Sequence, residues 1–149
     1  MTIHQKKYKK WAKMKSIIEK FHWWFAGNPR DIFWTNIGTN IGNEACWHGD
    51  GWIRPVLVIK RYGNLHLVVP MTTHWLYEDQ GTWLIKKYHH KITSLDFGRK
   101  SYLMMNQLQT IDRKRFTKKV YDKNGKYAQL WVDAFIYIKN QIRKQMKTN

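Results

Sequence analysis

The stretch IRPVLVIKRYGNLHLVVP, residues 53–70, decides the fold of this chain. Residues 55–59 form a β-branched apolar run of strand length, and Gly63 and Asn64 follow as a turn signal. Residues 65–69 form a second apolar run that ends before Pro70, which lacks the N–H group that a neighbouring strand needs. We therefore predict an antiparallel strand pair, with residues 55–59 in a central strand and residues 65–69 as its partner.

Further short segments on both sides of this pair have strand character. They are residues 31–34, 83–85, 102–105 and 116–121. Clusters of Gly, Asn and Asp between them are typical of turns. Short strands without long intervening helices favour an antiparallel sheet, and curling such a sheet into a small barrel removes its exposed edges.

Amphipathic helices are predicted on both sides of this β region. Residues 5–25 carry apolar side chains at intervals of three and four from Trp11 onward, and residues 126–147 repeat that spacing. The fold class is therefore α+β, and the chain is expected to be one domain. Its expected parts are an N-terminal helical extension (1–28), a β-barrel (30–121) and a C-terminal helix (126–147), together covering residues 1–149.

The charge of the chain is strongly positive and concentrated at its two ends. Lys and Arg number 27 against 10 Asp and Glu, which gives +17 over 149 residues. Residues 1–30 carry +7 and residues 112–149 carry +8, whereas residues 31–111 carry only +2. This distribution is typical of a protein that binds a polyanion such as nucleic acid, and simple solubility is the alternative explanation.

Several classes of protein are disfavoured by composition. One cysteine, Cys46, cannot form a disulfide framework or a cysteine-based zinc site, and it suits a reducing, cytoplasmic location. No apolar run approaches the roughly 20 residues of a membrane helix, so no membrane partner is expected. The seven His residues are scattered and phosphate-binding Gly loops are absent, so neither a metal nor another cofactor is expected.

Four segments occur in an order that is unlikely to arise by chance. They are NIGNE (40–44), RPVLVI (54–59), PMTT (70–73) and LMMNQLQTIDRKR (103–115). With these segments the chain resembles the MazF/PemK (Kid) toxins of type II toxin–antitoxin systems, and it is most similar to longer PemK-like members with an extra N-terminal helix. The resemblance covers roughly residues 30–145.

The resemblance implies a fold, an activity and partners. The implied fold is a small SH3-like barrel with a C-terminal helix, in a homodimer. The implied activity is metal-independent cleavage of single-stranded RNA, chiefly mRNA, which leaves a 2′,3′-cyclic phosphate and a 5′-hydroxyl. The implied protein partner is an antitoxin whose acidic or flexible tail occupies the RNA groove.

RNA cleavage without a metal uses the 2′-hydroxyl of the RNA itself as nucleophile. The reaction needs a base, an acid for the leaving oxygen and a cation for the charge that builds up on the phosphate. Arg54 suits the last task, since its planar fork pairs with two phosphate oxygens and the adjacent Pro55 is rigid. The resemblance also makes Arg54 the catalytic arginine, whereas an ordinary surface arginine at a strand end is the alternative.

The resemblance implies catalytic roles for two more residues. Thr72 matches the catalytic threonine, although its position after Pro70 would also suit a structural turn. Glu44 matches an acidic position and would pair with Arg54, contact RNA or act as a base. We expect it to support Arg54.

The identity of the acid and the base is left open by two departures from the family pattern. Met104 and Asn106 stand where one branch has an arginine and an aspartate, and neither side chain transfers protons at neutral pH. His74 has a suitable pKa and is one substitute, with an exposed structural histidine as the alternative. A weakened or inactive toxin is a further possibility.

The remaining candidates concern RNA binding. Trp47 and Trp52 flank a Gly-containing loop and would stack on splayed bases. Thr73 and His74 would contact RNA beside Thr72. Asn106 and Gln107 would line the site, and Arg113 and Arg115 would follow the RNA backbone. Two other functions stay open: a toxin of the same fold that acts on DNA gyrase without cutting RNA, and a plain nucleic-acid-binding module.

Overall fold

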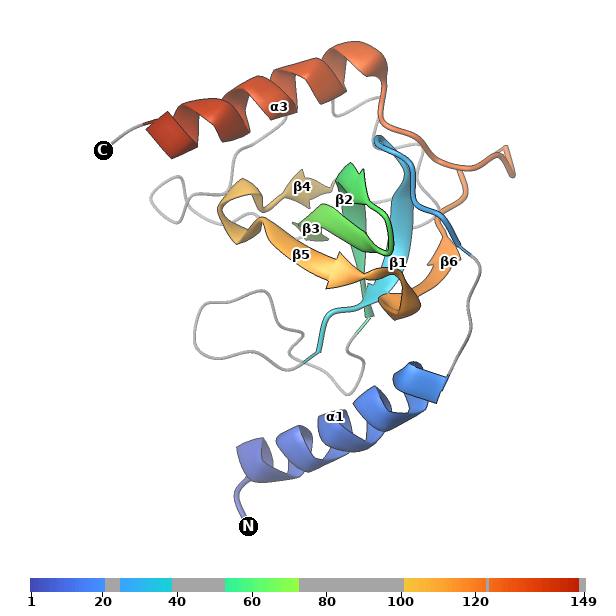
Figure 1. Cartoon of the computed structure of the whole chain (residues 1–149), viewed down its shortest axis with the longest axis vertical. Coiled ribbons are helices and arrows are strands. Elements are labelled where there is room, and N and C mark those ends of the chain that lie inside the picture. Colours follow the sequence, from blue (N-terminus) through green and yellow to red (C-terminus); the bar gives the residue numbers. More distant parts are fainter. Residues whose placement is uncertain (21–24, 39–52, 73–100, 123, 148–149) are drawn as a thin grey trace.

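The structure is a computed structural model, and it describes residues 1–20, 25–38, 53–72, 101–122 and 124–147. Within these residues, the helices α1 and α3 lie on either side of a set of short strands (Figure 1). In chain order the elements are α1 (Ile3–Lys20), β1 (Ile32–Asn36), β2 (Ile53–Tyr62), β3 (Leu65–Thr72), β4 (Tyr102–Leu103), the 3₁₀ turn η3 (Met105–Gln107), β5 (Gln109–Asp112), the 3₁₀ turn η4 (Arg113–Arg115), β6 (Phe116–Lys119) and α3 (Val132–Lys147).

The strands form one antiparallel sheet in the order β4-β3-β2-β1-β6, with β5 also paired to β3. β2 is the central strand, as predicted, and β3 is its antiparallel partner. The turn between them uses Gly63, whose φ of 62° lies in the left-handed region that glycine adopts without strain. The α+β class and the antiparallel sheet predicted from the sequence are confirmed.

The sheet curls until its two edges come close together. β5 pairs with β3 near one edge and β6 pairs with β1 at the other, yet only the three residues of η4 separate them along the chain. Residues from both edges pack in one inner core, where the rings of Phe33 and Phe116 stack with centroids 4.3 Å apart. This inner core contains Phe33, Ile37, Val56, Val58, Val68, Ile111 and Phe116.

The opposite face of the sheet is covered by α3. Ala134, Phe135, Ile138 and Ile142 recur at helical spacing and pack against sheet residues such as Leu57. α1 lies at the other end of the molecule from α3 (Figure 1). α3 therefore covers a face of the sheet, whereas α1 contacts η4.

Pro70 does not end its strand, contrary to the prediction, because β3 continues to Thr72. The carbonyl oxygen of Pro70 accepts the Met104 N–H at 2.9 Å, so the missing Pro70 N–H lies on that same side. Met104 therefore gets no return bond from Pro70, and its carbonyl oxygen accepts the Gln107 N–H at 2.8 Å instead. Because Met104 bonds to Gln107 instead of to Pro70, β4 ends at Leu103 and η3 begins. The apolar pattern predicts a longer strand, over residues 102–105.

Other predicted boundaries also differ from the structure. α3 begins at Val132 rather than at residue 126, because the preceding residues still bond to the sheet: the Leu130 N–H donates to the Arg30 carbonyl oxygen at 3.0 Å. β5 was not predicted, since Ile111 is its only buried residue and the apolar signal is weak. The N-terminal helix is described to Lys20, and the strand expected at 83–85 lies outside the described residues.

Candidate functional site

Arg54 lies near the start of β2, beside the C-terminal end of β1. Its backbone pairs with Thr35, and it shares the inner face of the sheet with Val56 because side chains alternate along a strand. The side chain is half-buried, and Nη1 donates to the carbonyl oxygen of Met71 at 3.4 Å and to Sδ of Met104 at 3.5 Å. Both contacts are long, both acceptors are neutral groups, and together they help to orient the guanidinium.

Thr72, the last residue of β3, directly follows Met71, whose carbonyl oxygen accepts from Arg54. The pairing of β2 with β3 extends to Val56 opposite Pro70, and continuing this register by two residues places Arg54 opposite Thr72. On its other side Thr72 pairs with Tyr102 of β4. Directly opposed residues project from the same face of a sheet, so Arg54, Thr72 and Tyr102 form one row across three strands.

Asn106 and Gln107 lie in η3, which follows β4 after Met104. The Sδ atom of Met104, at the start of this turn, contacts Arg54, so η3 lies beside the guanidinium. Asn106 is exposed and Gln107 is half-buried. One end of the sheet therefore gathers a guanidinium, a hydroxyl and two amides, which are the groups that bind phosphate oxygens.

Several sequence-predicted residues lie outside the described residues, namely Glu44, Trp47, Trp52, Thr73 and His74. In the chain, Trp52 directly precedes β2 and Thr73 directly follows β3. Their proposed roles stay predictions.

Arg113 and Arg115 lie in η4 rather than in the row of Arg54. The Arg115 side chain is half-buried: Nη1 donates to the Ile37 carbonyl oxygen at 3.1 Å, and the guanidinium carbon lies 5.6 Å from the ring centre of Trp11. Burial lowers the pKa of Arg115 below its ordinary value, and the nearby Asp112 opposes this shift. Arg115 thus joins α1 to the end of β1, and the Arg113 side chain is also half-buried.

Three features of this site are not evident from the sequence. The Met71 carbonyl oxygen and the Met104 thioether orient Arg54, and Tyr102 lies beside Thr72. In the sequence, Met104 stands out only as a departure from a family pattern. Because β4 is two residues long, no hydrophobic periodicity reveals its register with β3, and the register is what brings these groups together.

A buried carboxylate lies at the opposite end of β1 and has a structural role. Asp31 is 1% exposed, and its carboxylate accepts the Asn28 N–H at 3.0 Å and the Gln129 side-chain amide at 2.6 Å. Lys119 forms an ion pair with it at 3.5 Å. These contacts fix residues 28–31 and 129 to the sheet, far along β1 from Arg54.

Metal-binding groups and membrane-spanning helices are both absent from the described residues. Within these segments, no group of three or more His, Cys, Asp or Glu side chains could hold a metal ion. No helix in the same segments is both long enough and apolar enough to cross a membrane.

A sequence model described as "PemK-like, MazF-like toxin of type II toxin-antitoxin system" matches residues 28–130. The chain belongs to this toxin family. The match includes all described strands of the sheet and both 3₁₀ turns, so the resemblance seen in the sequence segments is confirmed. It excludes α1 and all of α3. No curated protein matches the chain.

Proposed function

We propose that this PemK-like toxin is a metal-independent endoribonuclease that cleaves single-stranded RNA. The observation that supports this best is the row formed by Arg54 and Thr72 on adjacent strands, with the amides of η3 beside it. The row lies at the end of a rigid sheet, where a phosphodiester can be held by positioned donors rather than by mobile loops.

The reaction uses the ribose next to the scissile phosphate. Its 2′-oxygen attacks phosphorus while the bond from phosphorus to the 5′-oxygen breaks, which gives a 2′,3′-cyclic phosphate and a 5′-hydroxyl. Arg54 stabilises the extra negative charge on the phosphate oxygens, and the Thr72 hydroxyl donates to one of those oxygens or orients the nucleophile. Asn106 and Gln107 position the chain through amide hydrogen bonds.

In this proposal, residues outside the row formed by Arg54, Thr72 and Tyr102 transfer the protons. Among the described residues, the neighbours of Arg54 and Thr72 include a carbonyl, a thioether and a tyrosine ring, none of which is an effective base at neutral pH. Glu44 and His74 precede and follow the two strands of the row in sequence. Glu44 supports Arg54 in this proposal, and loss of one limb of the pH–rate profile in Glu44→Gln or His74→Gln would identify the base.

The proposal includes partners and a location. As in the family, the RNA is mRNA in the cytoplasm, the toxin is a homodimer and an antitoxin protein neutralises it. Trp47, Trp52 and Thr73 contact the RNA bases or backbone on either side of the row, and Arg113 contacts the backbone beyond it.

The proposal is tested with purified protein, mixed-sequence RNA and EDTA, followed by mapping of the RNA ends. We expect 5′-hydroxyl ends, and we expect Arg54→Ala to lower the cleavage rate about 10²–10³-fold, as is typical for loss of a positioned charge-stabilising donor. Arg61→Ala is a matched control, because Arg61 lies on the same strand, is exposed and belongs to the opposite end of β2.

Three results would contradict the proposal. Intact RNA together with arrest of DNA supercoiling would indicate a toxin that acts on gyrase. Salt-sensitive RNA binding without either effect would indicate a plain binding module. Equal loss of cleavage in Arg54→Ala and Arg61→Ala would separate the activity from this site.

A further inference from the structure

α1 is fixed to the barrel by a narrow stripe of its own residues. Trp11 and Ile18, two turns apart, are the two buried residues of the helix. The Trp11 ring lies against Gly38, where any added Cβ would overlap it, and the Arg115 guanidinium lies over the same ring. α1 is therefore held in place at the C-terminal end of β1, and its other faces are turned to solvent.

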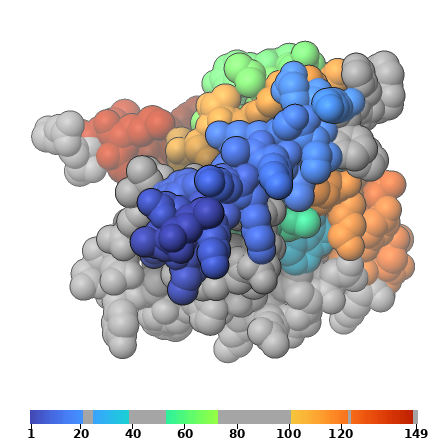
Figure 2. Space-filling model, turned by 90° about the horizontal axis from the view of Figure 1, so that it is seen from below, coloured from blue at the N-terminus to red at the C-terminus, as the bar shows by residue number. Residues whose placement is uncertain are grey.

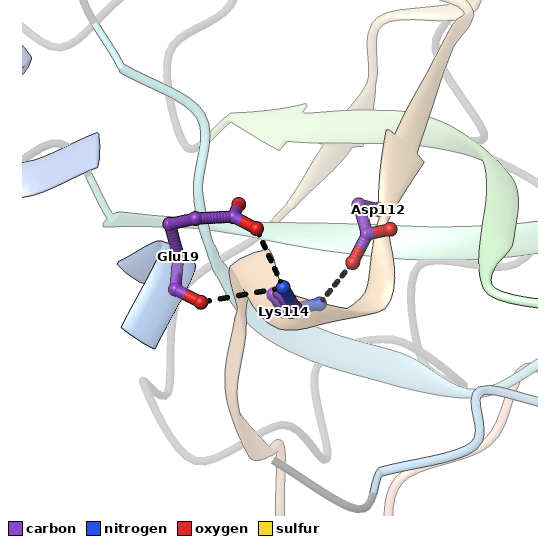
Figure 3. Close-up of polar contacts among 3 residues, drawn as sticks. All are labelled: Glu19, Asp112 and Lys114. Atoms are coloured by element: carbon purple, nitrogen blue, oxygen red, sulfur yellow. Dashed lines mark hydrogen bonds and ion pairs between the residues drawn. The ribbon is translucent and has the colours of Figure 1, made fainter. Parts of the chain in front are cut away.

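A second contact uses the only acidic residue of the helix. Lys114 Nζ of η4 forms an ion pair with Glu19 Oε1 at 2.8 Å and donates to the Glu19 carbonyl oxygen at 3.3 Å (Figure 3). The Lys114 N–H in turn donates to the Asp112 carboxylate at 2.8 Å. Because Glu19 binds Lys114, it does not offset the lysines on the outer side of α1.

These lysines form a line opposite the docking stripe. With about 100° of rotation per residue, Lys6, Lys9 and Lys13 fall within a sector of about 60° on the side away from Trp11 and Ile18. All three are exposed. We call this set the lysine stripe. The first and last are about 10 Å apart along the helix axis. Figure 2 shows α1 as a ridge on the surface of the molecule.

The lysine stripe is unfavourable for the helix itself. Lys6 and Lys9 are three residues apart and Lys9 and Lys13 are four apart, and like charges at these spacings repel each other by a few tenths of a kcal/mol per pair. Lys6 also lies in the first turn, which contains no acidic residue, where the helix dipole favours negative charge. A bound polyanion would relieve both effects.

α1 is attached at the same end of the sheet as the proposed cleavage site. Arg54 pairs with Thr35 of β1, and Thr35 pairs with Phe116 of β6 on its other side, so the backbones of Arg54 and Phe116 are about 10 Å apart across two strand spacings. Arg115, which contacts α1, directly precedes Phe116. RNA that leaves the Arg54 site toward β6 is therefore directed to the side of the sheet that carries α1.

We propose that the lysine stripe of α1 is a second binding surface for the sugar–phosphate backbone of single-stranded RNA, continuous with the Arg54 site. The proposal rests on the proposed ribonuclease function. α1 lies outside residues 28–130, which the toxin family model matches, so membership of the family does not by itself account for this surface. A lipid surface suits α1 less well, because the side chains that would enter it, Trp11 and Ile18, are packed against the barrel.

Exposed Tyr8 favours RNA over an acidic protein. It is 42% exposed and lies about 100° around α1 from Lys9, on the side between the docking stripe and the lysine stripe, where an exposed aromatic ring offers a stacking surface for an unpaired base. An acidic peptide offers charge but no such planar partner.

The test compares the triple variant Lys6→Gln, Lys9→Gln, Lys13→Gln with the wild-type protein. The probes are 2′-O-methyl uridine oligonucleotides, a long one and a hexamer, which cannot be cleaved because the nucleophile is blocked. We expect affinity for the long RNA to fall about tenfold at low salt, and the salt slope to shrink by about 0.7 for each phosphate that the lysines no longer neutralise. Affinity for the hexamer should fall less, since it is too short to cover both surfaces.

The matched control is the triple variant Lys126→Gln, Arg143→Gln, Lys147→Gln, which removes the same charge from exposed positions outside α1. It should keep the wild-type salt slope. A second variant set, Lys→Arg at positions 6, 9 and 13, should also keep it, because charge is preserved. Circular dichroism checks that α1 is still helical in each variant.

Two outcomes would overturn the proposal. One is an equal change of salt slope in the α1 variant and the control. The other is a loss of affinity for poly-glutamate with no loss for RNA, which would indicate an acidic protein partner. Neither outcome depends on RNA cleavage, so failure of the ribonuclease assay and failure of this proposal are distinguishable.

Discussion

At the scale of single residues, neutral groups position the charged residue of the site. Arg54 contacts a backbone carbonyl and a thioether, and both accept a hydrogen bond without adding charge. Arg115 has a structural role instead. Its guanidinium binds the Ile37 carbonyl and lies against Trp11, so it stabilises the junction of α1 with β1. Whether Arg115 also contacts RNA stays a prediction.

His66 makes the stability of the protein sensitive to acid. The ring is 0% exposed and packs edge-on against Phe116, and Nε2 has no hydrogen-bond partner among the described residues. Burial lowers the pKa of His66 below its ordinary value of 6.5, helped by the charge of Arg61 and opposed by Asp112 and by backbone carbonyls. The unfolded chain therefore takes up a proton more readily than the folded one.

We predict that the free energy of unfolding is highest above pH 6.5 and decreases as the pH falls below that value, until the folded protein also protonates His66. Urea denaturation at a series of pH values measures this. His66→Gln should flatten the profile, whereas His4→Gln should leave it unchanged because His4 is exposed. Parallel profiles for wild type and His66→Gln would contradict the prediction.

At the scale of elements, the attachment of α1 depends on one glycine. Gly38 has a φ of 98°, and an added Cβ would overlap the Trp11 ring. Gly63 also has a positive φ, of 62°, which lies in the left-handed region that alanine can enter, and a Cβ there meets nothing within 4 Å. Substitution of Gly63 therefore tests backbone strain alone, whereas substitution of Gly38 also disturbs the docking of α1.

We predict that Gly63→Ala destabilises the protein by about 1–2 kcal/mol, which is the strain of a left-handed alanine. Gly38→Ala should cost more, because a φ of 98° is more strained for alanine and because the added Cβ displaces a buried tryptophan. Urea denaturation gives both values, and hydrogen exchange of the α1 amides should accelerate only in Gly38→Ala. Equal losses of stability would mean that Trp11 adjusts at little cost.

At the scale of the whole molecule, exposed apolar side chains support the proposed homodimer. Trp131, Val132 and Ile136 are each more than half exposed and lie within about one turn of the start of α3. Clusters of this kind in soluble proteins are often covered by a second chain. We predict a dimer by sedimentation equilibrium and a weaker dimer for Ile136→Lys. Ile17→Lys on α1 is the control, and a wild-type monomer at every concentration would contradict the prediction.

Much of the scaffold follows from the sequence alone. The apolar runs on either side of Gly63 and Asn64 predicted β2 and β3, because hydrophobic pattern and turn chemistry act over a few residues. The spacing of apolar residues predicted both terminal helices for the same reason. The segments RPVLVI and PMTT carried the family resemblance, and the family is confirmed.

Other features were decided by long-range pairing. Pro70 stays inside β3 and η3 replaces the end of a predicted strand because Met104 pairs across 34 residues of chain. β5 is a strand because β3 pairs with it, although its own sequence is largely polar. The contact of Arg54 with Met104, and the docking of Trp11 on Gly38, depend on register and on curling of the sheet. Local sequence patterns specify neither the register nor the curling of the sheet, because both depend on contacts between residues far apart in the chain.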